Sequence, residues 1–301
     1  MRVYDLIVIG AGPAGITASV YAARKRLDFL VISLDIGGQA AWSGEIENYT
    51  GYQFISGPDL AQKFQEHMLS YDTALKENEE VLELERSGGT FTVKTSKAQY
   101  QSRSVIIASG KRSRKLMIPG EDEFKNRGLT YCATCDGPLF SGKTVAVIGG
   151  GNSALDAVLQ MIRIARQVYL VNNAPGLGGD QIMRQKVQEA SNLVIFNDCR
   201  VTAVTGDKFV SGITIRDGSG SRELPVQGVF VEIGLDPNSS FAAEVEKNGN
   251  GEIKVNLRNE TNIPGIFAAG DVTDVPEKQI IIAAGEGSKA ALSAFRYLLT
   301  K

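Results

Sequence analysis

The chain repeats one local pattern: a short apolar run, a glycine turn and an alanine-rich helix. In the first copy, Asp5–Ile9 leads into Gly10-Ala11-Gly12-Pro13-Ala14-Gly15. In the second, Thr144–Ile148 leads into Gly149-Gly150-Gly151-Asn152-Ser153-Ala154. A strand, a glycine turn and a helix within about thirty residues form the unit that holds a dinucleotide. The sequence therefore predicts two such folds.

Each glycine of the first turn has a physical task. Gly10 permits a tight turn, Gly12 lets a pyrophosphate approach the backbone, and Gly15 lets helix and strand pack closely. The helix N-terminus then offers unpaired N–H groups and a partial positive charge to the phosphates. A second, weaker dinucleotide site is expected at the residues of the other turn: Gly149, Gly151, Asn152, Ser153 and Ala154.

Two polar, glycine-containing breaks, Ser109–Arg114 and Gly234–Ser240, follow apolar runs and suggest domain boundaries. We predict an α/β protein of two Rossmann-like dinucleotide-binding domains with three-layer ββα architecture, the second inserted into the first. The first domain would comprise residues 1–112 and 242–301, and the second residues 113–241. Alternating patterns at 83–95 and 201–222 predict a small β-meander appended to each domain.

Composition narrows the classes of function. A length of 301 residues suits two domains, and a net charge of −2 favours neither nucleic acid nor an anionic membrane. No apolar run approaches the roughly 20 residues that span a bilayer, and the start has no signal-peptide layout. We expect a cytoplasmic protein. With three cysteines and the single histidine His67, no metal site is expected.

Two of the cysteines form the motif Cys132-Ala133-Thr134-Cys135, at a predicted helix start. A helix N-terminus stabilises a thiolate, and two cysteines on one turn can close a small disulfide that accepts and donates two electrons. Asp136 follows directly and could pass protons. The alternative is a structural or metal-binding pair. Cys199 has no partner in the sequence and is expected to be a half-buried apolar residue.

Two acidic residues are candidate ligands of the first dinucleotide. Asp35 lies twenty residues after Gly15, where a carboxylate can accept a ribose hydroxyl, although an exposed loop carboxylate is an equal alternative. Asp271 follows an apolar strand and Gly270, and could accept a bond from a ribityl hydroxyl. Its alternative role is to cap a helix.

The whole chain resembles the low-molecular-weight thioredoxin reductase family. The matching segments are Gly10–Gly15, Gly37-Gly38-Gln39, Glu47-Asn48-Tyr49, Ala108-Ser109-Gly110, Cys132-Ala133-Thr134-Cys135-Asp136-Gly137, Gly149–Ala154 and Gly270-Asp271. The resemblance implies that FAD is the first cofactor. The residues expected along it are Gln39, Asn48, Gly110, Gly270, Asp271 and Gln279.

The resemblance also assigns roles to the dithiol. It implies that Cys135 faces the flavin, that Cys132 attacks the disulfide of the partner, and that Asp136 is the acid. The partner would be thioredoxin or a thioredoxin-like protein, and the oligomer a homodimer.

One segment departs from the family. The family carries a His-Arg-Arg run after the second strand of the inserted domain, and these arginines bind the 2′-phosphate of NADPH. This chain has Asn172-Asn173-Ala174 there, followed by a longer loop. Each lost charge-assisted contact costs roughly 1.5–3 kcal/mol. The acidic residue that usually selects NADH is also missing, and Arg184 is expected to be a solvated helix residue.

Several functions remain open. We rank first a thioredoxin reductase-like flavoprotein that takes electrons from a donor other than NADPH, such as reduced ferredoxin or a reduced deazaflavin. A reductase that uses NADPH or NADH through atypical contacts ranks slightly below it. A dithiol oxidase and a flavin-binding module without turnover rank well below both.

Overall fold

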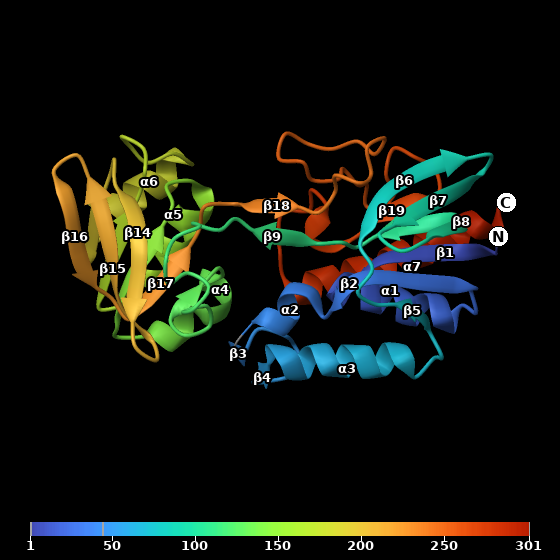
Figure 1. The fold of residues 1–301 in the computed structure, drawn as a ribbon, viewed down its shortest axis with the longest axis horizontal. Coiled ribbons are helices and arrows are strands. Elements are labelled where there is room, and N and C mark those ends of the chain that lie inside the picture. The colour runs from blue at the N-terminus through green and yellow to red at the C-terminus, as the bar shows by residue number, and fades with distance from the viewer. Residues whose placement is uncertain (1, 44, 301) are drawn as a thin grey trace. The chain divides into compact units, whose positions relative to one another are not determined.

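The computed structural model describes residues 2–43 and 45–300, which divide into two compact units. One unit comprises Met1–Ser43, Glu47–Arg112 and Asp236–Lys301, and the other Gly44–Ile46 and Ser113–Leu235. Each is built on a largely parallel sheet (Figure 1). The predicted α/β class with Rossmann-like folds is confirmed.

The sheet of the first unit has the strand order β5-β2-β1-β8-β7-β6, with β19 also paired to β8. Its strands are β1 (Val3–Ala11), β2 (Phe29–Ile36), β5 (Ala74–Lys76), β6 (Val81–Ser87), β7 (Thr90–Thr95), β8 (Gln99–Ile107) and β19 (Ile266–Ala268). The pairs of β1 with β2 and β8 are parallel, whereas β6, β7 and β8 pair antiparallel. The meander at 83–95 is therefore continuous with the dinucleotide-binding sheet through β8.

The helices of the first unit are α1 (Pro13–Arg24), α2 (Gly38–Trp42), α3 (Gly57–Leu69) and α7 (Ile280–Leu299), with the short strand β4 (Ile55–Ser56). The short strand β3 (Glu45–Ile46) belongs to the second unit. Because side chains alternate along a strand, Leu6 and Val8 pack with α1 and α7 on one face of β1. Ile7 and Ile9 face the other core, with residues of β6 and β7. Both faces are buried, as a parallel sheet requires.

The second unit has a five-stranded parallel sheet in the order β10-β17-β11-β12-β13. These strands are β10 (Leu129–Thr130), β17 (Gly228–Val231), β11 (Thr144–Ile148), β12 (Gln167–Val171) and β13 (Leu193–Phe196). Its helices are α4 (Ala133–Asp136), α5 (Asn152–Met161) and α6 (Gln181–Gln188), with a 3-10 turn at Gly137–Phe140. A separate antiparallel sheet follows, made of β14 (Arg200–Gly206), β15 (Val210–Asp217) and β16 (Gly220–Pro225).

Two strands connect the units. The outgoing segment forms β9 (Lys111–Ser113) and the returning segment forms β18 (Leu235–Pro237), and the two strands pair. The chain thus re-enters the first unit at Asp236, earlier than the boundary at 242 that the loop-like composition of 234–240 suggested. Short-range pattern conceals this strand because its pairing partner lies far away in the sequence.

Candidate active site

The first glycine turn leaves no room for side chains where the backbone closes on itself. Gly10 has φ +105°, and a Cβ there would lie 2.3 Å from the carbonyl oxygen of Ala108. A Cβ at Gly15 would lie 1.9 Å from the carbonyl oxygen of Gly10. At Gly12, the N-cap of α1, a Cβ would meet no atom within 4 Å. The open space at this helix N-terminus fits a pyrophosphate.

Asp35 lies near the end of β2 and its side chain is exposed. Ser33 connects the end of β2 to the glycine turn. Its hydroxyl accepts the Ala11 N–H at 2.9 Å and donates to the Asp35 carbonyl oxygen at 2.5 Å. Ser33 was not among the residues predicted from the sequence, although a serine within an apolar strand was a visible signal. Exposure leaves the Asp35 carboxylate free to meet a ribose.

Three predicted amide side chains of the first unit make defined contacts. The Asn48 amide donates to the Gln279 side-chain oxygen at 3.1 Å, which brings together two residues from distant parts of the chain. Gln279 is the N-cap residue of α7. The Gln39 amide donates to the Lys111 carbonyl oxygen at 2.5 Å, next to Gly110 with φ +65°.

Asp271 lies in a 3-10 turn, Gly270–Val272, directly after β19. Burial raises its pKa, against the lowering effect of Lys278 and Lys111. It does not cap α7, whose N-cap is Gln279. A half-buried carboxyl just beyond the carboxyl end of a parallel strand is suited to bind a hydroxyl group.

A buried charge network that the sequence did not reveal lies in the same unit. Glu252 forms ion pairs with Lys111 and, at 3.4 Å, with Lys278, and it accepts from the Asn248 amide at 2.5 Å. Burial alone would raise the pKa of Glu252, but these partners lower it overall. No local motif marks this network, because its members come from three separate segments.

The second glycine turn repeats the first in part. Gly149 has φ +140°, and a Cβ there would lie 2.2 Å from the carbonyl oxygen of Glu232. A Cβ at Gly151 would meet no atom within 4 Å. Ala154 is fully buried. The Asn152 side-chain oxygen accepts the Asp180 N–H at 2.7 Å, which fixes the loop before α6. The predicted second dinucleotide site therefore keeps its open position.

The loop after β12 is organised by Asn172, whose side chain is buried. Its amide donates to the carbonyl oxygens of Ala174 and Gly176 at 3.1 and 3.0 Å and to the side-chain oxygen of Asn197 at 3.0 Å. Asn173 next to it is exposed. Where the related family has arginines, this chain therefore has a structural amide and a neutral surface residue.

Arg184 is half-buried, so the expectation of a solvated residue is wrong. It donates to the Leu177 carbonyl oxygen at 3.4 Å. It also lines a cavity of about 430 Å³ with Gly176, Leu177, Gln181, Gln185, Gln188, Ile195 and Asn197. The cause is the long loop before α6, which folds back on this helix.

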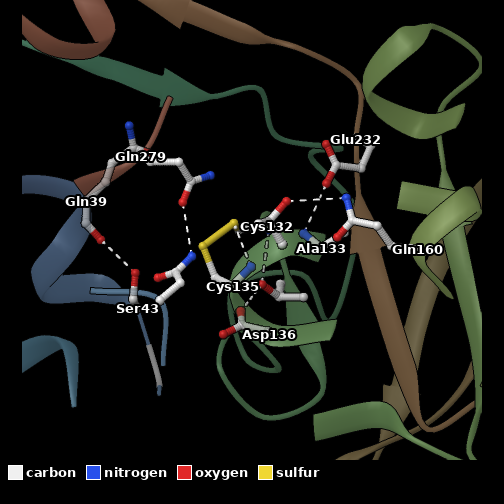
Figure 2. Close-up of a disulfide and its surroundings, with 12 residues drawn as sticks. Gln39, Ser43, Cys132, Ala133, Cys135, Asp136, Gln160, Glu232 and Gln279 are labelled. Atoms are coloured by element: carbon white, nitrogen blue, oxygen red, sulfur yellow. Dashed lines mark hydrogen bonds between the residues drawn. A yellow bond between two sulfur atoms is a disulfide. The ribbon is translucent and has the colours of Figure 1, made fainter. Parts of the chain in front are cut away.

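Cys132 and Cys135 form a disulfide with a Cα–Cα distance of 5.3 Å (Figure 2). Cys132 is the N-cap of α4, and its Sγ accepts the Cys135 N–H at 3.2 Å. Asp136 is buried and accepts a hydrogen bond from the Thr130 hydroxyl. That hydroxyl also accepts the Cys132 N–H at 3.2 Å, which links the carboxyl to the first cysteine.

Glu232 is a second carboxyl beside this helix and was not among the residues predicted from the sequence. Its side chain accepts the Ala133 N–H at 3.4 Å (Figure 2). Burial raises the pKa of Glu232 to about 7. The sequence signal was weak: one acidic residue directly after the apolar run of β17.

Cys199 is almost fully buried, more so than expected, and burial raises its pKa. Within 2–43 and 45–300, no three histidine, cysteine, aspartate or glutamate residues gather into a metal-binding group. Over the same ranges, every helix is too short or too polar to cross a membrane.

Comparisons with known proteins agree on one family. The profile described as "Pyridine nucleotide-disulphide oxidoreductase" matches residues 4–287. A subunit of alkyl hydroperoxide reductase from Xanthomonas campestris pv. phaseoli is 42% identical over 98% of this chain and 57% of its own length. "NADH dehydrogenase" of Bacillus subtilis (strain 168) is 40% identical over 98% and 59%. The chain thus spans under two thirds of these curated relatives.

Solved structures match over almost the full length of both chains. Thioredoxin reductase from Streptococcus pyogenes MGAS5005 is 34% identical with a TM-score of 0.94, covering 99% of each chain. A ferredoxin-flavin thioredoxin reductase from Clostridium acetobutylicum is also 34% identical, with a TM-score of 0.55 and 99% coverage of each chain.

Proposed function

Since the chain belongs to the pyridine nucleotide-disulphide oxidoreductase family and is a flavoprotein oxidoreductase with the thioredoxin reductase fold, we propose that it reduces a disulfide on a thioredoxin-like protein. Two electrons would pass from a donor by way of FAD and the Cys132–Cys135 disulfide. The observation that carries this proposal is the disulfide at the start of α4, with the buried Asp136 linked to it through Thr130.

The residues of the first unit fit FAD. The open position at Gly12 and the N-terminus of α1 would hold the pyrophosphate, and Asp35 the adenosine ribose. Asp271 and the pair Asn48 and Gln279 would bind the ribityl chain and the ring. When bound, FAD supplies a two-electron carrier.

The dithiol would carry out the exchange with the partner. Reduction of the Cys132–Cys135 disulfide takes up two electrons and two protons. The Cys132 thiolate attacks one sulfur of the partner disulfide, forms a mixed disulfide and releases the other partner sulfur as a thiolate, which takes up a proton. Cys135 then attacks Cys132, restores the internal disulfide and releases the second partner thiol. Asp136 holds the proton that these sulfurs exchange.

For the donor, we favour NADH over NADPH. The open position at Gly151 suits a pyrophosphate at the N-terminus of α5. The Asn172 side chain is hydrogen-bonded to its own loop, and both Asn172 and Asn173 are neutral. Neither therefore offers a cation to a 2′-phosphate. The Arg184 side chain is turned to Leu177. NADH lacks this phosphate, and the relative named "NADH dehydrogenase" aligns over 98% of this chain.

Reduced ferredoxin, or a reduced deazaflavin, is the second candidate donor and the one that the sequence ranked first. The neutral Asn172–Ala174 segment supports it as well, because such a donor needs no nucleotide site. The likeness to the ferredoxin-flavin thioredoxin reductase also supports it. The two donors differ in one respect: only NADH makes use of the open turn at Gly151.

One experiment separates the donors. The purified holoprotein is mixed without oxygen with NADH, NADPH, reduced ferredoxin or reduced deazaflavin, and the loss of flavin absorbance is followed by stopped flow. We expect NADH to bleach the flavin fastest, and oxidised thioredoxin to restore the colour. Fast bleaching by ferredoxin alone would select the second donor. If reduced holoprotein left every thioredoxin-like disulfide intact, the proposed function would be wrong and a flavin-binding module would remain.

Two further properties are proposed: a homodimer, which the resemblance implies, and a cytoplasmic location, which is the expectation from the sequence. Size-exclusion chromatography with light scattering tests the first. A mass of one chain, from the 32.3 kDa sequence, would contradict it. Cell fractionation tests the second.

A further inference from the structure

Glu232 is held firmly at the carboxyl end of β17. Its N–H donates to the Ile148 carbonyl oxygen at 2.8 Å, which continues the pairing of β17 with β11. Its own carbonyl oxygen lies so close to Gly149 that a Cβ there would clash at 2.2 Å. The backbone on which the carboxyl stands is therefore fixed on both sides.

The Glu232 carboxyl contacts the first peptide N–H of α4. The acceptor is one side-chain oxygen and the donor is Ala133, 3.4 Å away (Figure 2). Ala133 follows Cys132, the N-cap residue whose sulfur would attack the partner. The peptide N–H that follows Cys132 thus meets a carboxyl group.

Three influences act on the Glu232 proton. Burial is the largest and raises its pKa, the Ala133 N–H lowers it, and the charge of Asp156 on α5 raises it, with a result of about 7. Gln160, also on α5, is neutral and bonds Asp156 and Thr134. Asp136, the acid on α4 itself, bonds Thr130 instead. Glu232 therefore changes charge in the pH range in which thiols react.

We propose that Glu232 is a positioning residue whose own proton controls the reactivity of Cys132 once the disulfide is opened. The inference rests on the proposed role of Cys132 as the attacking thiol. A protonated Glu232 places no charge beside the Cys132–Ala133 peptide, so a Cys132 thiolate meets no repulsion from it. An ionised Glu232 takes the Ala133 N–H and adds a negative charge near Cys132, which raises the thiol pKa.

The test is the pH dependence of Cys132 alkylation. The holoprotein is reduced with excess dithiothreitol, freed of it, and treated with iodoacetamide between about pH 5 and pH 9. Peptide mass spectrometry then measures the alkylation of Cys132 separately from that of Cys135 and Cys199. Wild type should show two inflections, the lower one near the Glu232 pKa of about 7. Glu232→Gln should show a single inflection and roughly threefold to tenfold faster alkylation near pH 8.

Asp156→Asn is the matched control, because it keeps Glu232 and removes the charge that raises its pKa. The lower inflection should move to lower pH in this variant. An unchanged profile in Glu232→Gln, or a lower inflection that stays in place in Asp156→Asn, overturns the proposal. Because chemical reduction replaces the donor, a failure of electron transfer from NADH or to thioredoxin is a separate result.

Discussion

The two glycine turns share their geometry but differ at the ends of their second strands. In both, the first glycine faces a carbonyl oxygen across the turn, Ala108 in one unit and Glu232 in the other. In both, the glycine that caps the following helix, Gly12 or Gly151, is open to a ligand. The first unit then presents an exposed carboxylate, Asp35, whereas the second presents Asn172, which is buried and bonds its own loop.

The difference indicates that the glycine turn is separate from the residues that select a particular nucleotide. The turn recognises the pyrophosphate that all dinucleotides share. In this fold class the residues near the end of the second strand select the adenosine end, and in the second unit Asn172 at this place bonds its own loop. An intact glycine motif therefore indicates a fold and a ligand class, and leaves the particular nucleotide open.

The two units also differ in how their buried polar side chains are paired. In the first unit a buried ion-pair network joins Glu252 to two lysines, Lys111 and Lys278. In the second unit a buried neutral amide, Asn172, bonds the loop that follows it. The following variants test these contrasts, beginning with the largest expected effect.

The dithiol belongs to the second unit, so its loss should leave the first unit intact. Cys135→Ser is expected to abolish thioredoxin reduction, with a loss on the order of 10³-fold or more. FAD content, read from absorbance after gel filtration, should stay at one per chain as in wild type. Cys199→Ser is the matched control and should keep full activity. Retained reduction by Cys135→Ser would remove the dithiol from the mechanism.

Glu252→Gln should destabilise the first unit by about 3–5 kcal/mol, because it leaves Lys111 buried without its partner charge. The exposed Glu223→Gln in the second unit should change the unfolding free energy by less than about 0.5 kcal/mol. Urea denaturation measures both.

The ion pair between Lys111 and Glu252 also predicts that stability depends on pH. The Glu252 pKa is lowered in the folded protein from its ordinary 4.5, so its stabilising effect is complete above that value and is lost as pH falls below it. Wild type should lose stability on acidification through this range more steeply than Glu252→Gln. Parallel curves for the two proteins would show that the network does not contribute to acid sensitivity.

A reciprocal exchange compares the third positions of the two turns. Gly15→Ala places a Cβ 1.9 Å from the Gly10 carbonyl oxygen, and we expect a loss of about 1–3 kcal/mol and weaker FAD binding. Ala154→Gly in the second turn should cost only about 0.5–1 kcal/mol. FAD retention and urea midpoints measure the contrast. Equal effects in both turns would mean that the first is less closely packed than described.

The smallest effect is expected at the adenosine end. The double variant Asn173→Arg, Ala174→Arg adds cations after β12 and should raise NADPH affinity by about tenfold, the value of one charge-assisted contact. NADH affinity should change little, and Asn173→Gln, Ala174→Gln is the neutral control. Fluorescence titration provides the constants. No gain in NADPH affinity would show that the 2′-phosphate does not reach this segment.

The sequence was sufficient for those parts of the fold that depend on local pattern. Apolar runs before glycine turns located β1 and β11, and the spacing of Cys132 and Cys135 placed them on one turn. The sequence could not predict contacts between distant segments. The pair Asn48–Gln279 was proposed only as two separate residues. The Lys111–Glu252 pair and the approach of Glu232 to Ala133 depend on chain topology, which no local spacing reveals.

The central claim, that FAD and the Cys132–Cys135 pair form one electron-transfer unit, is tested most directly by counting electrons. Anaerobic titration of the holoprotein with dithionite should consume about four electrons per flavin before bleaching is complete, two for the flavin and two for the disulfide. The variant with serine at both cysteine positions should consume about two. Equal uptake by the two proteins would contradict the account.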